Sequence, residues 1–338
     1  VWVEEQAGYP LLYYSFRIGG NWSTPQALFV GEEPDLVATA NGQFHLVYSN
    51  EFSDNYEIFY SCWVNGHWQP PVNVSYTRRG TSSQPAITAS PDGKLFIVWT
   101  DTTEGFPRIY HAWQENGMWN TYLVPSSVGG SSPDIAIGKD GRVWVTWQVL
   151  EEPADTGHYD IYAIYGDGIH WASFAMNVSE STEADSLAAK IAGDTHRGAF
   201  LVWQEDEGQH SHIYYADTLL YKDWWSIGER ISQGGTQAEQ PAITVDGAGN
   251  VYVAWEEGTE LLFRRRLASS GEWLPSSTLA QASGLEAVAL AHDTFVLHAA
   301  WTQTKPDLGT KTSQRDVYYR HGQMIWPYHL WTPLVFAP

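Results

Sequence analysis

The chain has 338 residues, of which 39 are Asp or Glu and 18 are Lys or Arg, so its formal net charge is −21. A hydrophobic fraction of 43% is too high for a disordered chain, and a single cysteine, Cys62, excludes a disulfide scaffold and a cysteine-based structural zinc site. The negative charge argues against nucleic acid or an anionic membrane as the main partner, and no run of about 18 apolar residues predicts a membrane span.

Aromatic residues recur along the whole chain at a regular spacing. One column consists of Trp2, Tyr48, Trp99, Trp147, Trp203, Trp255 and Trp301, and its members are 46 to 56 residues apart. A second column consists of Trp22, Trp68, Trp119, Trp171, Trp225, Trp273 and Trp326. Thirteen of the 18 Trp fall in these two columns, which indicates an internal repeat rather than chance.

Each repeat carries the same local signals, for which the third repeat serves as an example. A short strand opening with Pro, at 85–88, precedes a Pro-Asp-Gly turn at 91–93. The second strand, 95–99, is rich in β-branched residues and ends in the first aromatic column. The third strand, 109–111, leads to the hairpin dipeptide Asn116-Gly117, and the fourth strand carries or follows the second-column Trp.

Four antiparallel strands in a unit of roughly fifty residues are typical of a β-propeller blade. We therefore predict an all-β, seven-bladed β-propeller of four-stranded antiparallel blades in a single domain over 1–338. The expected blades span approximately 1–33, 34–80, 81–130, 131–184, 185–237, 238–284 and 285–338.

The first predicted blade lacks its first strand, because Trp2 already belongs to the second strand of that blade. The C-terminal segment 332–337 resembles the first strand at 84–89 and offers one way to complete the blade. Only seven residues separate Trp326 from Pro333, however, which leaves little chain for an outer strand and a return. A first strand that precedes Val1 is the alternative, and the short connection favours it slightly.

The repeat unit, with its Pro-x-Ile-Ala, Asp-x-Gly, hydrophobic-Trp, Ile-Tyr-Tyr and Asn-Gly-x-Trp segments, resembles the blades of sialidase-like propellers with Asp-box repeats. It is also similar to related bacterial extracellular propellers and propeller lectins. The Asp-box itself is degraded, and 167–171 and 269–273 are its nearest segments. The resemblance covers nearly the whole chain and implies the fold and a secreted, extracellular or cell-surface protein, whereas propellers host many unrelated activities.

The resemblance also implies what a true sialidase would need, namely an arginine triad, a Tyr nucleophile with its Glu, and an Asp acid/base. Phe16-Arg17-Ile18-Gly19 echoes the family's arginine motif, but it has Gly in place of Pro and precedes a hairpin turn. Arg264, Arg265 and Arg266 alternate along one strand and cannot share a face, so we expect part of an exposed edge rather than a triad. No complete catalytic set is recognised.

Carboxylates recur in the loops that follow the first aromatic column, and equivalent loops of a propeller gather on one face. The binding candidates on that face are Asp101, Glu104, Glu151, Glu152, Asp155, Glu205, Asp206, Glu256, Glu257 and Asp307. Calcium or a cationic or polyhydroxylated ligand would suit them. A solvated acidic rim is the alternative, and the absence of a regular Asp-x-Asp-x-Asp spacing favours it.

Three further features have both a functional and an ordinary interpretation. His210 and His212 would share one strand face and could hold a metal, but no third ligand is in view, so no metal site is predicted. The sequons that begin at Asn21, Asn73 and Asn177 are glycan acceptors or simply repeat consensus. The longest loops, 149–159 and 302–315, are where we expect a partner to bind.

The sequence therefore favours a secreted, non-catalytic propeller that binds a glycan or another protein without a required cofactor. The first alternative is a glycoside hydrolase of the sialidase-like class, which would be an exo-glycosidase. The second alternative is a structural component of a cell surface or filament.

Overall fold

The computed structural model describes residues 1–77, 79–151, 157–219, 223–293, 296–305, 314–323 and 331–335. This part of the chain is built from β-strands with one short 3-10 turn, Lys139–Gly141. It contains no helix with the length and apolar character needed to cross a bilayer.

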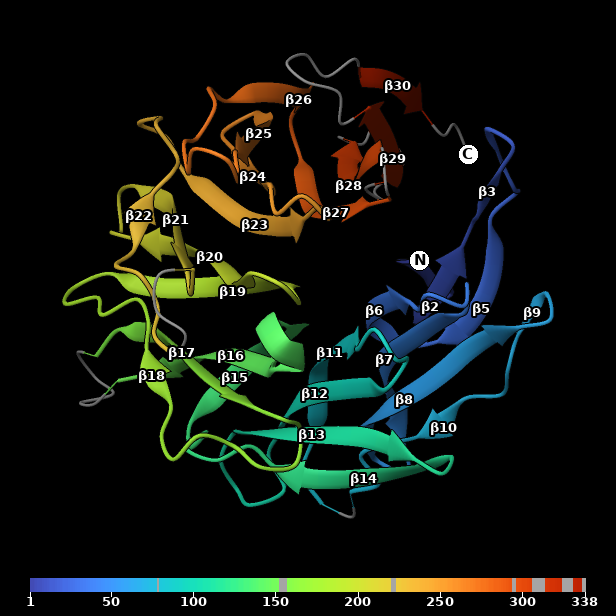
Figure 1. Cartoon of the computed structure of the whole chain (residues 1–338). Helices are drawn as coiled ribbons and strands as arrows, with labels where there is room; N and C mark the ends of the chain where they lie inside the picture. Colours follow the sequence, from blue (N-terminus) through green and yellow to red (C-terminus); the bar gives the residue numbers. More distant parts are fainter. Residues whose placement is uncertain are drawn as a thin grey trace. The chain divides into compact units, whose positions relative to one another are not determined.

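The first three sheets follow one another in chain order (Figure 1). The first contains β1 (Trp2–Gln6), β2 (Tyr9–Tyr14) and β5 (Gln26–Val30), beside a ribbon of β3 (Arg17–Ile18) and β4 (Asn21–Trp22). The second contains β6 (Glu32–Ala38), β7 (Phe44–Phe52), β8 (Asn55–Val64) and β10 (Val72–Asn73), with β9 (His67–Trp68) also on β8. The third contains β11 (Ser82–Ala89), β12 (Leu95–Asp101), β13 (Arg108–Glu115) and β14 (Met118–Leu123).

The other four sheets each have four strands. The fourth contains β15 (Gly130–Ile137), β16 (Val143–Leu150), β17 (Tyr159–Gly166) and β18 (Met176–Asn177). The fifth contains β19 (Asp185–Asp194), β20 (Gly198–Asp206), β21 (Ser211–Asp217) and β22 (Glu229–Arg230). The sixth contains β23 (Ala238–Val245), β24 (Val251–Glu257), β25 (Glu260–Arg266) and β26 (Ser277–Gln281). The seventh contains β27 (Leu285–His292), β28 (Val296–Lys305), β29 (Gln314–Gln323) and β30 (Trp331–Val335).

These seven sheets are the blades of an all-β, seven-bladed propeller, and the first blade has three strands, as the repeat predicted. The chain divides into two compact units. Unit 1 comprises Val1–Ile137, Gly141–Val149 and Ala163–Ala175, and it holds blades 1 to 3. Unit 2 comprises Gly138–Asp140, Leu150–Tyr162 and Met176–Pro338, and it holds blades 5 to 7, while blade 4 has strands in both.

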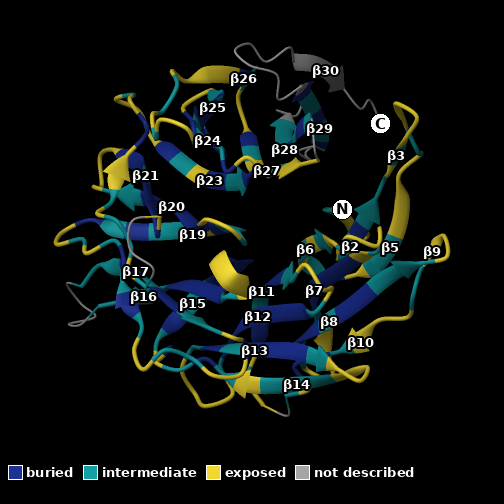
Figure 2. Cartoon of the chain, viewed as in Figure 1, coloured by how far each residue is buried: buried dark blue, intermediate teal, exposed yellow. Residues whose placement is uncertain are grey.

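The hydrophobic core of each unit lies between neighbouring blades. In unit 1, Val47 and Ile58 of blade 2 pack with Ile97 and Trp99 of blade 3. The second strand of blade 3, β12, is covered on both faces and is buried along its whole length, as Figure 2 shows. The first aromatic column therefore supplies core residues, and removing a ring such as Trp99 costs about 3–5 kcal/mol of stability.

Residues of the second aromatic column pack against the preceding blade. The indole of Trp119 meets the ring of Tyr60 edge-on, with ring centroids 5.0 Å apart, and Trp273 meets Tyr215 in the same way at 5.1 Å. Such edge-to-face pairs contribute about 0.5–1.5 kcal/mol beyond the area they bury.

The first strands of the blades begin earlier than we predicted. Pro85, expected to open a strand, lies three residues inside β11, where the strand register shifts at a bulge. Prolines lie in the same way two or three residues inside β6, β15 and β23, namely Pro34, Pro133 and Pro241. The extra residue of a bulge interrupts the ladder of backbone hydrogen bonds between the strands. A proline at this point, which has no backbone N–H, therefore costs no ladder hydrogen bond.

β19 and β27 have the same bulge, and all six bulges contain a non-glycine residue with a φ between 50° and 55°. These residues are Glu33, Gln84, Ser132, Ala188, Gln240 and Ala287. The left-handed region is unfavourable for such residues, so contacts made by the bulge must stabilise it.

The position of the C-terminal strand excludes one of the two explanations for the incomplete first blade, namely that this segment completes it. β30 pairs antiparallel with β29, with Leu334 opposite Tyr319, and is the fourth strand of blade 7. Residues 331–335 are therefore the outer strand of blade 7 rather than the first strand of blade 1.

The three consecutive arginines of β25 alternate as predicted, but the expectation of an exposed edge was wrong. Arg264 and Arg265 are each only 7% exposed. Arg264 donates hydrogen bonds to the carbonyl oxygens of Ile231 and Leu274. Arg264 therefore links blade 6 to the segment that follows the last strand of blade 5, and Arg265 lies over the ring of Tyr252 in its own blade.

Candidate functional site

Three of the predicted binding carboxylates anchor the first-column tryptophans. The indole N–H of Trp203 donates to Oε2 of Glu205 at 2.7 Å, and that of Trp255 donates to Oε2 of Glu257 at 2.9 Å. Asp101 accepts equivalent bonds from Trp99 and from the Ser82 hydroxyl, and it is 1% exposed. In each case the acid lies two residues after the Trp, on the same strand face, so a large part of the acidic ring has a structural task.

Three other predicted carboxylates also make local contacts. Glu104 pairs with Arg108 at 2.9 Å, Glu151 accepts a 2.6 Å bond from the Tyr162 hydroxyl, and Asp206 accepts the Gly208 amide at 2.8 Å. Glu152, Asp155 and Asp307 lie outside the described residues, as do 152–156 and 306–313 of the two long loops.

Glu256 has a different environment. It lies directly opposite Glu239 on β23, and its Oε1 is buried without a hydrogen-bond partner in the described part of the chain. Burial, followed by the negative charges of Glu239 and Glu286, raises the pKa of Glu256 to about 7. This carboxyl group can therefore hold a proton near neutral pH.

A hydrogen-bond relay connects the bulges of successive blades. The carboxylate of Glu33 accepts the backbone N–H of Gln84 at 2.7 Å, and the amide oxygen of Gln84 accepts the N–H of Ser132 at 2.9 Å. In unit 2, Gln240 accepts the N–H of Ala287 at 3.2 Å. The relay satisfies the N–H groups exposed by the left-handed bulge residues and so explains how this conformation persists.

A polar pocket of about 440 Å³ lies in unit 2, between the loop that follows β18 and the end of β20. It is lined by residues 179–184, Glu205 and Glu207. Four of these side chains are carboxylates, three carry a hydroxyl group, and none is basic. The lining can therefore accept hydrogen bonds in many directions and carries a local negative charge.

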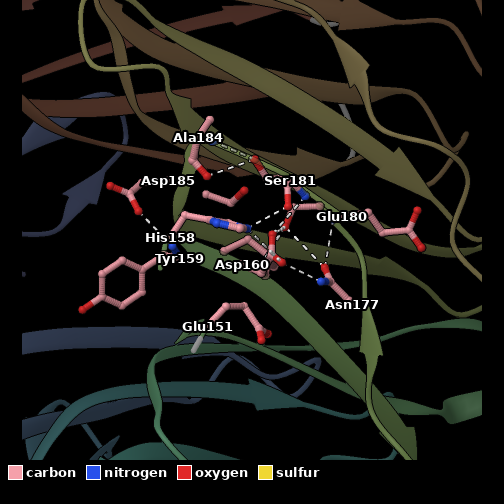
Figure 3. A network of polar contacts seen from close by, with 12 residues as sticks. Glu151, His158, Tyr159, Asp160, Asn177, Glu180, Ser181, Ala184 and Asp185 are labelled. Atoms are coloured by element: carbon pink, nitrogen blue, oxygen red, sulfur yellow. Dashed lines mark hydrogen bonds and ion pairs between the residues drawn. The ribbon is translucent and has the colours of Figure 1, made fainter. Parts of the chain in front are cut away.

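A buried carboxylate holds the loop of this pocket in place (Figure 3). Asp160 accepts hydrogen bonds from the Asn177 amide at 2.6 Å, the Ser179 hydroxyl at 2.7 Å and the Ser181 backbone N–H at 3.0 Å. His158 reaches the carbonyl oxygen of Ser181 at 2.7 Å. The side chains of Asn177 and Ser179 in the sequon therefore have a structural role, and Asp160 holds the loop that lines the pocket.

Blade 2 contains the same loop with different charges. Glu57 accepts bonds from Ser75 and Thr77, as Asp160 does from Ser179 and Ser181. The residue between the two partners is left-handed in both loops, with φ 48° at Tyr76 and 47° at Glu180. The loop geometry therefore does not require the acidic residues of blade 4.

His212 is a neighbour of the pocket residue Glu205 but does not itself line the pocket. It lies opposite Glu205 in the β20–β21 register, so both side chains lie on one face of the sheet. The residue is 6% exposed, and its Nδ1 has no hydrogen-bond partner among the described residues. His210 stacks on it with ring centroids 6.5 Å apart, but the described residues contain no group of three or more His, Cys, Asp or Glu that could hold a metal ion.

Sequence reasoning did not single out Glu239 and Glu286, or the pocket residues Glu180, Glu183 and Glu207. The position of Glu239, two residues before a bulge proline, was visible in the sequence, but its pairing with Glu256 depends on the register shift.

The segment around Arg17 that resembles the sialidase arginine motif lies in the β3–β4 hairpin, where Nε of Arg17 donates to the Gly20 carbonyl oxygen. None of the first strands of blades 2 to 7 carries an arginine.

No protein-family model and no curated protein matches the sequence. Among solved structures, the chain is similar to a protein of unknown function from Dyadobacter fermentans, with a TM-score of 0.62 and 11% identity over 87% of this chain and 93% of that one. It is similar to the GH93 α-L-arabinofuranosidase of Fusarium graminearum in complex with arabinobiose, with a TM-score of 0.57 and 13% identity over 84% and 92% of the two chains. It is also similar to a PL25 ulvan lyase, with a TM-score of 0.62 and 9% identity over 92% and 87%. At these identities the likeness supports the propeller fold alone.

Proposed function

We propose that this propeller is a secreted or cell-surface protein that binds glycans non-catalytically, and that the polar pocket of unit 2 is its binding site. The pocket carries the proposal, because about 440 Å³ is in the size range of small-ligand sites. Its carboxylates and the Thr182 hydroxyl suit the many hydroxyls of a sugar, whereas the Ser179 and Ser181 hydroxyls are bonded within the protein. The use of similar propellers by an arabinofuranosidase and an ulvan lyase adds support by analogy.

Glycan-array binding by the purified chain tests this proposal. We expect binding to a limited set of oligosaccharides, and we expect the variant Glu183→Arg, which places a cation in the pocket, to change that set. Glu115 is exposed and lies outside the pocket, so Glu115→Arg is the matched control. An array without binding, or identical profiles for all three proteins, would argue against the proposal.

A glycoside hydrolase is the second candidate function, and Glu256 is the observation that favours it. A general acid must be protonated at the working pH, and a second carboxylate must stand nearby; Glu256 and Glu239 have these two properties. The first strands without arginine argue against the sialidase version with its arginine triad.

Release of sugar from arabino-oligosaccharides and from sulfated uronic-acid polysaccharides tests the hydrolase. If Glu256 is the acid, Glu256→Gln lowers the rate by about 100-fold or more, and Glu115→Gln leaves it unchanged. Equal rates in all variants, or no product at all, would remove this candidate.

A further inference from the structure

We propose that the free edge of β1 in blade 1 is a docking site for an extended peptide strand donated by another polypeptide. β1 pairs with β2 on one side, and no strand of the described chain pairs with its other side. In the other six blades, the equivalent second strand has a first strand on that side. These six blades therefore show what kind of segment the edge of β1 is built to accept.

β1 makes the contacts of a second strand, apart from those to a first strand. Trp2 stacks on Tyr13 of β2 with ring centroids 6.1 Å apart. In blade 3, Trp99 stacks on the equivalent Tyr110 at 6.1 Å. The Trp2 indole N–H also donates to Oε1 of Glu4, two residues later, at 2.6 Å. Other blades form the same pair of a tryptophan and an acid, so the comparison between blades is well defined.

The acid of this pair lacks its first-strand partner in blade 1. In blade 3, the Ser82 hydroxyl lies directly opposite on the first strand and donates to Asp101 at 2.9 Å. Ser186 donates to Glu205 at 2.9 Å in the same way in blade 5. Asp101 is 1% exposed, whereas Glu4 is exposed. A serine of an added strand, placed opposite Glu4, would complete the arrangement.

The backbone of β1 offers the matching hydrogen-bonding groups. In three complete blades, the residue three positions after the column tryptophan donates its N–H to the carbonyl oxygen of the residue that precedes the first strand. These pairs are Thr102 with Thr81 at 3.0 Å, Gly258 with Gln237 at 3.2 Å and Thr304 with Gly284 at 2.7 Å. Glu5 holds this position in blade 1, and the alternation of an antiparallel ladder turns the N–H groups of Val3 and Glu5 toward the free edge. Pro10, opposite Glu5 on β2, has no N–H, and its carbonyl oxygen accepts the N–H of Gly31 instead.

Apolar surface that a first strand covers elsewhere is accessible on β1. The column tryptophans of blades 3 to 6 are at most 1% exposed, whereas Trp2 is half-buried and Val1 is 37% exposed. Burying apolar surface is favourable, and an edge strand with unpaired N–H and C=O groups is a template for another strand. The edge therefore combines backbone pairing with apolar contact, as in peptide recognition by strand addition.

The charge of β1 disfavours a second copy of this chain as the occupant. Two β1 strands paired antiparallel through Val3 and Glu5 would place Glu4 directly opposite Glu4 of the other copy. Like charges in this position are destabilising, and the net charge of −21 adds repulsion between copies. The fitting occupant is an extended peptide without acidic residues, with a serine opposite Glu4 and apolar residues beyond the bulge.

Fluorescence anisotropy with a labelled peptide that carries the sequence of residues 81–90 tests the proposal, because these residues include the first strand of blade 3. We expect saturable one-to-one binding, weaker by about tenfold or more for a scrambled peptide. Alanine at the second position of the peptide, the counterpart of Ser82, should weaken binding by roughly fivefold through the lost bond to Glu4.

Two variants of Glu5 locate the peptide on the protein. Glu5→Pro removes an N–H that faces the free edge, leaves the pairing with β2 intact and should weaken binding by about tenfold or more. Glu5→Ala keeps the N–H and should bind like the parent. The alanine peptide requires no change in the protein, so the test stays decisive if Glu5→Pro disturbs the fold.

Several outcomes would overturn the proposal. These are no saturable binding, equal binding of the scrambled peptide, and unchanged binding to Glu5→Pro in its folded form. A dimer in sedimentation equilibrium that Glu5→Pro dissociates would assign the edge to a second copy instead. The protein isolated from its natural source should bind the peptide as tightly. An edge already filled by the same polypeptide would give no binding there and would also overturn the proposal.

Discussion

Glu239 and Glu256 lie directly opposite each other on neighbouring strands of blade 6, so two carboxylates share one face of the sheet. Like charges in this arrangement repel each other, and burial adds to the cost of ionising both. The pair is therefore most stable when it holds a proton. This arrangement is absent at the matching position of blade 3, where Ser83 faces Thr100.

The pH dependence of stability should reveal this pair. The pKa of Glu256 is raised from its unfolded value of 4.5 to about 7, so its favourable contribution is complete below pH 4.5 and is lost as the pH rises through 7. We expect Glu256→Gln to be more stable than the parent by about 1–2 kcal/mol above pH 7, and the gain to vanish below pH 4.5. Urea unfolding across this pH range measures the difference, and a gain that does not change with pH would contradict the assignment.

The carboxylate anchor of a column tryptophan should matter for folding rather than for binding. Asp101 accepts bonds from the Trp99 indole, the Ser82 hydroxyl and the Thr103 amide, and it is buried. Asp101→Ala leaves these donors unsatisfied and should cost about 3 kcal/mol, measured by chemical unfolding. Glu115→Ala on the surface should change stability by less than about 0.5 kcal/mol, and an equally small effect for Asp101→Ala would show that the anchor is dispensable.

The relay between bulges should also be visible in stability. The Gln84 side chain accepts bonds from the Thr100 hydroxyl and the Ser132 backbone N–H, which joins blades 3 and 4. Gln84→Ala should cost about 2 kcal/mol because the Thr100 hydroxyl loses its acceptor and the Ser132 N–H keeps only its 3.2 Å bond to that hydroxyl. Gln209 lies in an exposed turn, so Gln209→Ala is the control. Equal unfolding midpoints for the two variants would rule out a role for the relay.

The three sequons should differ in their N-glycosylation when the chain is secreted from eukaryotic cells. Asn21 is exposed, whereas the Asn177 amide donates a 2.6 Å bond to Asp160, which a glycan on that nitrogen would remove. We expect glycopeptide mass spectrometry of the folded, secreted fraction to find the modification at Asn21 and not at Asn177. High occupancy at Asn177 in folded protein would contradict the structural role of this side chain.

The sequence by itself determined the fold, because each blade needs its own aromatic residues where it packs against the neighbouring blades. Column tryptophans such as Trp99 and Trp119 must pack between neighbouring blades, and the Asn-Gly turns close hairpins locally. These are short-range requirements, so they remain readable at a fixed spacing along the chain. The bulges escaped prediction because proline is compatible both with the start of a strand and with a bulge.

The roles of the carboxylates were decided only by the tertiary structure. In the sequence, Asp101, Glu205 and Glu256 are alike, since each follows a column tryptophan by one or two residues. Successive side chains of a strand point to opposite faces. An acid two residues after the tryptophan, such as Asp101 or Glu205, therefore lies on the side of the indole, whereas Glu256, one residue after its tryptophan, lies opposite the bulge of the neighbouring strand β23. Whether an acid becomes an anchor, a proton-holding carboxyl or the wall of a pocket therefore depends on what the next strand and the next blade place opposite it.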